Sequence, residues 1–189
     1  MEERGIETSL AFKVSTITIL TAITAVFTLA VRIPVAPTRG YINLGDVAIY
    51  FSALTFGPLT ALIAGGLGTA LADIIGGYAQ YAPITFIAHG FQGFVIGLIV
   101  RGLLIRKKDE IAIDKGKRLD FIGLVLAFMS GTIVMAGVYL LAEAFMVGLG
   151  AALAELPGNI IQNVAGIAGG IPLTLAIRKA YPPILNFRW

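Results

Sequence analysis

Long apolar stretches separated by short polar segments make up most of this sequence. The uncharged stretches cover residues 14–31, 47–72, 74–100, 121–142 and 156–177. At about 1.5 Å of rise per residue, most of them have the length of one helix that crosses a bilayer of roughly 30 Å. The second stretch contains Gly57-Pro58, a pair through which a helix rarely runs. This stretch is therefore either one kinked span or a hairpin of two shorter helices.

The positions of the lysines and arginines favour the hairpin. With five crossings, the 14 basic residues would split nine to five across the membrane. With six crossings, only Arg32 and Arg39 lie outside and the others lie on the side of both termini. The excess of Lys and Arg in cytoplasmic segments of membrane proteins supports the second arrangement.

The predicted fold is an all-α membrane protein, a six-transmembrane-helix bundle with cytoplasmic N- and C-termini. Residues 1–189 form a single domain embedded in the cell membrane as a multi-pass protein. The charged run 106–120 is predicted to be a cytoplasmic loop. We expect helices near residues 10–31, 45–56, 58–75, 83–105, 119–147 and 156–179. We expect outer connections at 32–44, 76–82 and 148–155.

Composition excludes several classes of function. Hydrophobic residues make up 57% of the chain and charged residues 13%, against about 25% charged residues in ordinary soluble domains. With no cysteine and one histidine, we expect no disulfide, metal site or cofactor. The basic residues flank apolar segments, which argues against a nucleic-acid partner. The sequence has no phosphate loop and no G-x-S-x-G motif, so it predicts binding, not catalysis.

Polar side chains within the predicted spans collect near their outer ends. A structural or functional role is expected for each of them, because a charged side chain at the bilayer centre costs on the order of 2.5–3.5 kcal/mol on insertion scales. Many share a helix face through i, i+3 or i, i+4 spacing, as His89 and Gln92 do. The candidate residues in the spans are Asp46, Asp73, His89, Gln92, Tyr139, Glu143, Asn159, Gln162 and Asn163. Above them, in the predicted outer connections, are Arg39, Tyr41, Asn43, Tyr78, Gln80 and Tyr81.

Aromatic rings, amides and a few charges suit a small flat heteroaromatic ligand that is held by stacking and hydrogen bonds. Other roles remain open for several of the same residues. Tyr78 and Tyr81 fit an aromatic belt at the membrane interface, and Arg39 fits a loop cation at the lipid headgroups. The structural alternatives are a helix cap for Asp46, snorkelling ends for Asp73 and Glu143, and an interior hydrogen bond for His89.

An ordered series of motifs runs along nearly the whole chain. The series comprises Ile42-Asn43-Leu44-Gly45-Asp46, Phe56-Gly57-Pro58, Gly68-Thr69-Ala70-Leu71-Ala72-Asp73, Gly76-Gly77-Tyr78, Ala82-Pro83-Ile84-Thr85, Gly90-Phe91-Gln92-Gly93 and Leu156-Pro157-Gly158-Asn159-Ile160-Ile161-Gln162. In this order the sequence resembles the substrate-binding S components of energy-coupling factor (ECF) vitamin transporters. It is most similar to the branch associated with riboflavin and hydroxymethylpyrimidine-type substrates.

The resemblance implies a high-affinity binding subunit for a vitamin or its precursor, captured from outside beneath a gate of two outer loops. It also implies that uptake needs a T component and two cytoplasmic ATPases. In such proteins, small residues of the first helix face the T component and the bundle topples in the membrane. Here the corresponding residues are Thr18, Thr21, Ala22 and Ala25, in place of the family's Ala-xxx-Ala pattern.

Two rival functions remain open at this stage. A self-sufficient, proton-coupled secondary transporter could use Asp73 and Glu143 as proton carriers. A membrane enzyme acting on lipid or isoprenoid groups would need paired acidic metal-binding motifs, which the sequence lacks. The sequence does not identify the vitamin, although the volume of the cavity would distinguish a flavin from a smaller ring.

Overall fold

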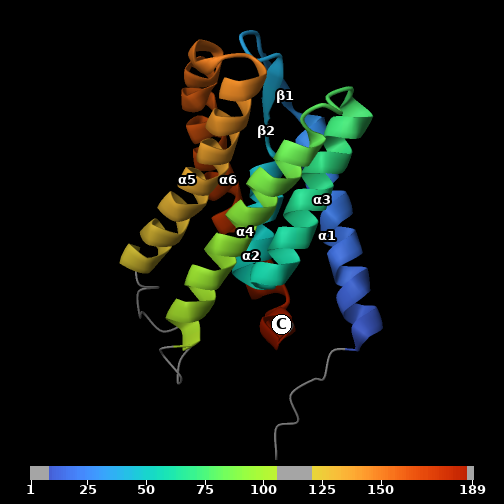
Figure 1. Ribbon diagram of the computed structural model, residues 1–189. Helices are drawn as coiled ribbons and strands as arrows, with labels where there is room; N and C mark the ends of the chain where they lie inside the picture. The colour runs from blue at the N-terminus through green and yellow to red at the C-terminus, as the bar shows by residue number, and fades with distance from the viewer. Residues whose placement is uncertain (1–8, 106–120, 187–189) are drawn as a thin grey trace, which may run out of the picture.

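The computed structural model describes residues 9–105 and 121–186 (Figure 1). The predicted cytoplasmic loop at 106–120 therefore lies outside the described residues. The elements are α1 (Leu10–Ala30), β1 (Arg32–Val35), β2 (Gly40–Asn43), α2 (Gly45–Thr55), α3 (Pro58–Gly76), α4 (Ala82–Ile105), α5 (Phe121–Met146), α6 (Leu149–Ala180) and the short 3-10 helix η1 (Pro182–Asn186).

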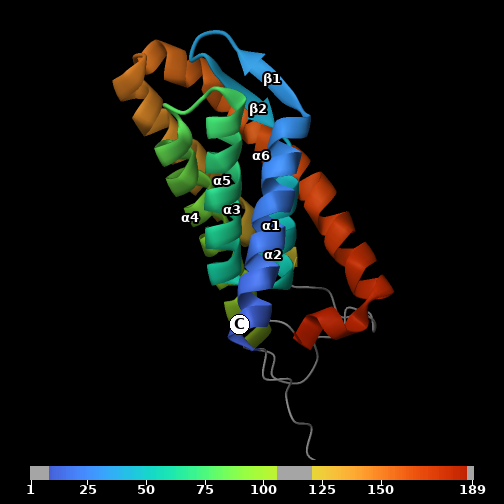
Figure 2. The same cartoon turned by 90° about the vertical axis from the view of Figure 1, so that its right-hand side faces the viewer.

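The helices run alternately up and down along one bundle. Figure 1 shows the strands β1 and β2 at one end, with the start of α1, the end of α4 and η1 at the other. We call the first of these the hairpin end. In Figure 2, α1 lies in front of α2 and α3, and it packs against both. Helix α3 packs against α4, α4 packs against α5, and α5 packs against α6.

Helix α2 is the centre of the bundle. All of its 11 residues are buried, and it packs against α1, α3, α4 and α6. At about 1.5 Å per residue it is roughly 16 Å long, too short to cross a bilayer alone. The other five helices of the described chain are long and apolar enough to do so. The hydrophobic faces of those five helices therefore suit contact with lipid, whereas α2 suits contact with the rest of the protein.

The Gly57-Pro58 pair separates α2 from α3, as predicted for two helices and not for one kinked span. Gly57 has φ 102°, a left-handed conformation that glycine adopts without steric cost. Pro58 occupies the first turn of α3, where its missing N–H leaves no intrahelical bond unmade.

Helix α6 begins earlier than the sequence indicated. The outer connection expected at 148–155 is wrong, because the helix already starts at Leu149 and continues through Pro157. Gly148, with φ 94°, turns the chain sharply after α5 ends at Met146. The Pro157-Gly158 pair suggested a helix start, but neighbouring helices in a membrane bundle allow an interior proline.

Residues expected to form only an outer connection contain an antiparallel hairpin. Strand β1 pairs with β2 in the register Arg32 to Asn43 and Val35 to Gly40. The chain then enters α2 directly, at Gly45. The hairpin therefore lies immediately above the buried helix and belongs to the same end of the bundle as the first residues of α4 and α6 (Figure 2).

Close approach of α6 to α2 depends on two glycines. A Cβ added at Gly166 would lie 2.4 Å from the Cβ of Asp46, and one added at Gly170 would lie 2.6 Å from the Cβ of Tyr50. Neither distance is possible for a real side chain, so these positions accept only glycine at this separation. Small residues at such spacing are how membrane helices bring their backbones together.

Candidate functional site

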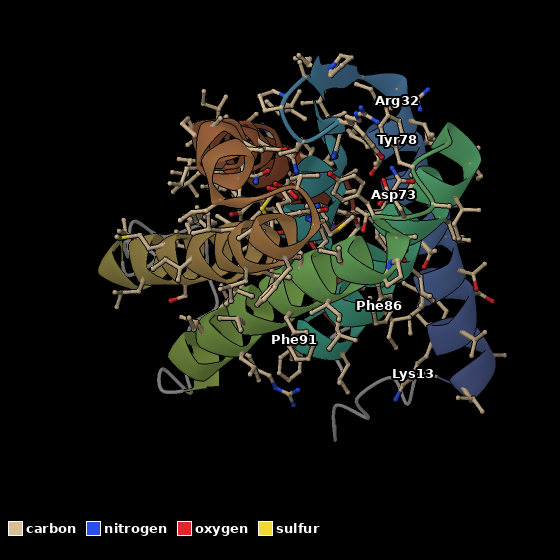
Figure 3. The ribbon with its side chains drawn as sticks, turned by 45° about the horizontal axis from the view of Figure 1, so that its top comes forward. Lys13, Arg32, Asp73, Tyr78, Phe86 and Phe91 are labelled. Atoms are coloured by element: carbon tan, nitrogen blue, oxygen red, sulfur yellow. The ribbon has the colours of Figure 1, made fainter. Side chains whose placement is uncertain are left out.

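A cavity opens at the hairpin end, between β2 and the ends of α3, α4, α5 and α6. The lining residues are Gly40, Tyr41, Asn43, Asp73, Tyr81, Thr85, Tyr139, Glu143, Glu155, Asn159 and Gln162. Figure 3 looks towards this end and shows Asp73 below Tyr78 and Arg32.

One wall of the cavity is formed by Asp73 and the aromatic rings beside it. The hydroxyl of Tyr41 donates to Oδ1 of Asp73 at 2.6 Å, while the ring of Tyr41 lies 4.6 Å from that of Tyr78. The guanidinium of Arg32 lies 6.0 Å from the Tyr41 ring centroid. The hydrogen bond with Asp73 fixes the Tyr41 side chain as a donor.

A second wall links the hairpin turn to α4 and α6. The hydroxyl of Tyr81 donates to the backbone oxygen of Thr38 at 2.5 Å, and the hydroxyl of Thr38 donates to the carboxylate of Glu155. Burial, together with the negative charges of Glu143 and Glu155, raises the pKa of Tyr81 to about 12. At neutral pH Tyr81 therefore stays protonated, and these bonds tie the hairpin turn to the start of α4 and to α6.

Glu143 on α5 and Glu155 on α6 face the same space. Both side chains are almost completely buried, at 1% and 3% exposure, and their carboxyl groups interact with each other electrostatically. Neither carboxyl oxygen of Glu143 has a hydrogen-bond partner among the described residues. The second oxygen of Asp73 is likewise buried and unpaired within the described ranges. Buried acceptors without donors are costly, so these oxygens are candidates for contact with a ligand.

Side-chain amides and the start of α2 form the floor of the cavity. The side-chain oxygen of Gln162 accepts from the backbone N–H of Asn43 at 2.7 Å, and the side-chain oxygen of Asn43 accepts from the N–H of Gly45 at 2.7 Å. These bonds fix β2 against α6 and satisfy the first turn of α2. Asn159, one helical turn before Gln162 and Asn163, is 5% exposed and lines the cavity.

Beneath this floor lies a fully buried polar network. His89 Nδ1 is 3.1 Å from a carboxylate oxygen of Asp46 and 2.8 Å from the side-chain oxygen of Gln92. The Gln92 amide and the Tyr50 hydroxyl both donate to Asn163 Oδ1, at 2.7 and 2.9 Å. The network joins α2, α4 and α6 in the bundle interior, where each bond replaces a lost contact with water.

The structure separates the candidate residues into three groups. Those that line the cavity are Tyr41, Asn43, Asp73, Tyr81, Tyr139, Glu143, Asn159 and Gln162. Those placed in the buried network instead are Asp46, His89, Gln92 and Asn163. Tyr78 backs the cavity through Tyr41, and Arg39 is an exposed residue of the hairpin turn with φ 57°.

Sequence reasoning did not include Gly40, Thr85 and Glu155, which also line the cavity. Glu155 was missed because the segment before Pro157 was expected to be a connection. As part of α6, it lies four residues before Asn159 and on the same face. Thr85 lies four residues after Tyr81, and its hydroxyl is 2.8 Å from the hydroxyl of Tyr139.

Helix α1 has two different faces. Leu20, Thr24 and Thr28 are buried against the neighbouring helices. Thr18 and Ala22 are exposed, whereas Thr21 and Ala25 are half-buried. The hydroxyls of Thr18 and Thr21 bond backwards to Val14 and Ile17, so this face presents few free polar groups. Within the described part of the chain, no group of three or more His, Asp or Glu side chains is placed to hold a metal ion.

Comparison with known proteins gives matches along most of the chain. The family model described as ECF-type riboflavin transporter, S component, matches residues 11–179. A protein of Pyrococcus woesei, described as an uncharacterized protein in the gap 3′ region, is 38% identical over 161 residues, 85% of this chain and 98% of that protein. The thiamine precursor transporter HmpT of Lactococcus lactis subsp. cremoris (strain MG1363) is 31% identical over 155 residues, 82% of this chain and 80% of HmpT. The family match includes every residue that lines the cavity.

Proposed function

This chain belongs to the family of ECF-type riboflavin transporter S components, and we propose that it captures a heteroaromatic vitamin or vitamin precursor in the cavity at its hairpin end. It is a membrane transport protein and not an enzyme. The observation that carries the proposal is the cavity itself, where buried carboxyl oxygens without donors stand beside tyrosine rings and amides. Rings supply stacking surfaces, while the polar groups fix the orientation of the ligand.

The proposed topology has six crossings in one domain over residues 1–189, with both termini in the cytoplasm. Helix α2 and strand β2 together make the second crossing, because α2 alone spans only half of the bilayer. This arrangement places Arg178 and Lys179, in the last turn of α6, on the cytoplasmic side. The cavity then opens to the outside, where a vitamin is captured.

The proposed gate over this cavity consists of the β1–β2 hairpin and the start of α4. Its support is the direct bond from Tyr81 to Thr38, which joins these two segments across the cavity mouth. The bond from Thr38 to Glu155 extends the same connection to α6. A ligand enters and leaves when these contacts open.

Uptake is proposed to need a T component and two cytoplasmic ATPases, with Thr18, Thr21, Ala22 and Ala25 on α1 as the docking face. The exposed Thr18 and Ala22 support this face, because small side chains permit close helix contact. Isothermal titration of the purified protein with riboflavin and with a hydroxymethyl-aminopyrimidine tests ligand capture. Uptake into liposomes, with and without the T component and ATPases, tests the partnership. Failure of both compounds and of other heteroaromatic vitamins to bind would contradict the proposed function.

A self-sufficient, proton-coupled secondary transporter is the second candidate. Asp73 and Glu143 favour it, since both are buried in apolar helices and carry unpaired oxygens. The same liposome experiment separates the two. Uptake driven by a proton gradient, with this chain as the single protein present, would support the second candidate, whereas ATP-dependent uptake with partners would support the first.

A further inference from the structure

An acidic side chain lies beneath the floor of the cavity, in the interior of the bundle. Asp46 stands in the first turn of α2 and is completely buried. One carboxylate oxygen of Asp46 is 3.1 Å from Nδ1 of His89, and the other accepts from the side-chain N–H of Gln162 at 3.5 Å. This carboxylate therefore joins α2, α4 and α6 next to the residues that form the floor.

His89 is the single histidine of the chain, and its ring faces acceptors and acids. Nδ1 lies within reach of two acceptors, the carboxylate of Asp46 and the side-chain oxygen of Gln92 at 2.8 Å, so this nitrogen carries a hydrogen. Asp73 on α3 is a second carboxylate that acts on the ring electrostatically. Among the described residues, His89 is the one basic side chain at ion-pair distance from Asp46. Because a buried charge without a partner is very costly, the two groups satisfy each other best as imidazolium and carboxylate.

The amide of Gln162 is held from both sides. Its oxygen accepts from the backbone N–H of Asn43 at 2.7 Å, and a backbone N–H is always a donor. The nitrogen of Gln162 therefore points the other way, towards Asp46. A flipped amide would set donor against donor at Asn43 and oxygen against oxygen at Asp46. Gln162 also lines the cavity, and an amide nitrogen has two N–H groups, so one serves Asp46 and the other is left for a ligand.

We propose that Asp46 is a positioning residue of the ligand site. With its charge balanced by His89, it orients the amide of Gln162 so that the cavity floor presents an N–H donor to a ring nitrogen or carbonyl oxygen of the ligand. Asp46 and His89 are fully buried and are not among the lining residues of the cavity, so they act on the ligand through Gln162. The inference rests on the proposed function, because it assigns the groups that orient one contact of the same cavity.

A double-mutant cycle between Asp46 and Gln162 tests whether one residue acts through the other. Isothermal titration is carried out on the purified full-length protein, on Asp46→Asn, on Gln162→Met and on the double variant. The probe is riboflavin or a hydroxymethyl-aminopyrimidine, whichever the wild-type protein binds more tightly. Asparagine keeps the shape of aspartate and removes its charge. We expect Asp46→Asn to weaken binding about tenfold, and by less than about twofold when Gln162 is already methionine.

Gln92→Met is the matched control, because it removes the other acceptor of His89 Nδ1 at an equally buried position. The amide of Gln92 donates to Asn163, so this change leaves the contact between Asp46 and Gln162 in place. A general loss of packing would lower the affinity of both variants in proportion to their unfolding temperatures in detergent. Positioning predicts that Asp46→Asn loses at least about threefold more affinity than Gln92→Met at a comparable loss of stability.

The single histidine supplies a spectroscopic signature that a merely structural role would not produce. In protein labelled with ¹⁵N-histidine and purified through an affinity tag without histidine, every imidazole signal comes from His89. An imidazolium has two similar nitrogen shifts, whereas a neutral ring has two widely different ones. We expect the imidazolium pattern in the wild-type protein and the neutral pattern in Asp46→Asn. Bound probe should shift the wild-type signals, and Gln162→Met should reduce that shift.

Several results would overturn the inference. An equal loss of affinity from Asp46→Asn with and without Gln162 would do so, as would a neutral His89 in the wild-type protein. If Asp46→Asn fails to fold, wild-type His89 signals that do not respond to the bound probe overturn it instead. In each of these cases the probe still binds the wild-type protein, so the proposed function stands. If no heteroaromatic vitamin or precursor binds the wild-type protein, the proposed function fails and the inference fails with it.

Discussion

Removal of one hydroxyl group, in Tyr81→Phe, should loosen the proposed gate over the cavity without changing the shape of the cavity wall. The Tyr81 hydroxyl donates to the backbone oxygen of Thr38 at 2.5 Å. Tyr81 is 5% exposed, so the phenylalanine ring fills the same buried space. The substitution leaves the Thr38 oxygen without this donor while the hairpin is closed.

The size of the effect follows from the value of one such bond. A buried hydrogen bond contributes about 0.5–1.5 kcal/mol net, and a loss of ~1 kcal/mol changes an equilibrium constant about fivefold. The open state of the hairpin should therefore become about five times more populated in ligand-free protein. The off-rate of a bound vitamin should rise by a similar factor if opening precedes release.

The same bond predicts a definite pH range. Because the pKa of Tyr81 is raised to about 12 in the folded protein, from about 10 in an unfolded chain, the folded state holds this proton more tightly. Its contribution to stability is thus complete below about pH 10 and is lost as the pH rises through about 12. The opening rate of the wild-type hairpin should stay constant with respect to this group between pH 7 and about 10.

Hydrogen exchange measured by mass spectrometry over residues 32–43 reports the opening directly. The peptides from this segment should exchange about fivefold faster in Tyr81→Phe, while peptides from α3 remain unchanged. Tyr78→Phe is the control, since it keeps the ring that packs against Tyr41 and should exchange like wild type. Exchange of residues 32–43 at the wild-type rate in a correctly folded Tyr81→Phe would refute the gate.

Three further predictions concern the cavity, the packing and the partner face. Asn159→Ala should weaken vitamin binding tenfold or more, equivalent to about 1.4 kcal/mol, in isothermal titration; unchanged affinity would remove Asn159 from the ligand contacts. Gly166→Leu should destabilise the bundle by about 1–3 kcal/mol or more, because even a Cβ would lie 2.4 Å from Asp46; a wild-type unfolding temperature in detergent would contradict that packing. Thr18→Trp combined with Ala22→Trp should abolish partner-dependent uptake in liposomes and leave vitamin affinity unchanged, since both residues are exposed and neither lines the cavity; normal uptake would exclude this part of α1 as the docking face.

Much of the helical architecture follows directly from the hydrophobic pattern. A membrane helix must satisfy its own backbone hydrogen bonds, so uncharged stretches such as 14–31 and 121–142 mark α1 and α5 closely. The Gly57-Pro58 pair marks the break between α2 and α3, because glycine accepts the positive φ at this position and proline fits the first turn of the next helix.

The start of α6 could not be predicted from the hydrophobic pattern. A Pro-Gly pair is a typical helix boundary in isolation, and only packing in the bundle allows the helix to run through Pro157. The error removed Glu155 from the candidate residues, although it lies on the same helix face as Asn159. The hairpin was missed for a related reason, since its short strands are formed by pairing and not by a long apolar run.

The division between cavity wall and buried network also depends on tertiary structure. Asn159, Gln162 and Asn163 have similar chemistry and adjacent positions, yet Asn163 bonds to Gln92 and Tyr50 in the interior while the other two line the cavity. Helical spacing places all three towards the bundle axis. Their depth relative to β2 decides which of them a ligand can reach, and that depth is set by the hairpin.

Mass spectrometry of small molecules bound to the purified protein tests most directly whether this cavity captures a vitamin. The protein is expressed in cells, purified without added ligand and compared with Asn159→Trp, whose larger side chain fills the cavity. We expect a heteroaromatic vitamin or precursor bound to the wild-type protein in about equal molar amount and lost from the folded variant. The same compound retained equally by both proteins, or no heteroaromatic compound on the wild type even after incubation with vitamins, would contradict the assignment of this cavity as the binding site.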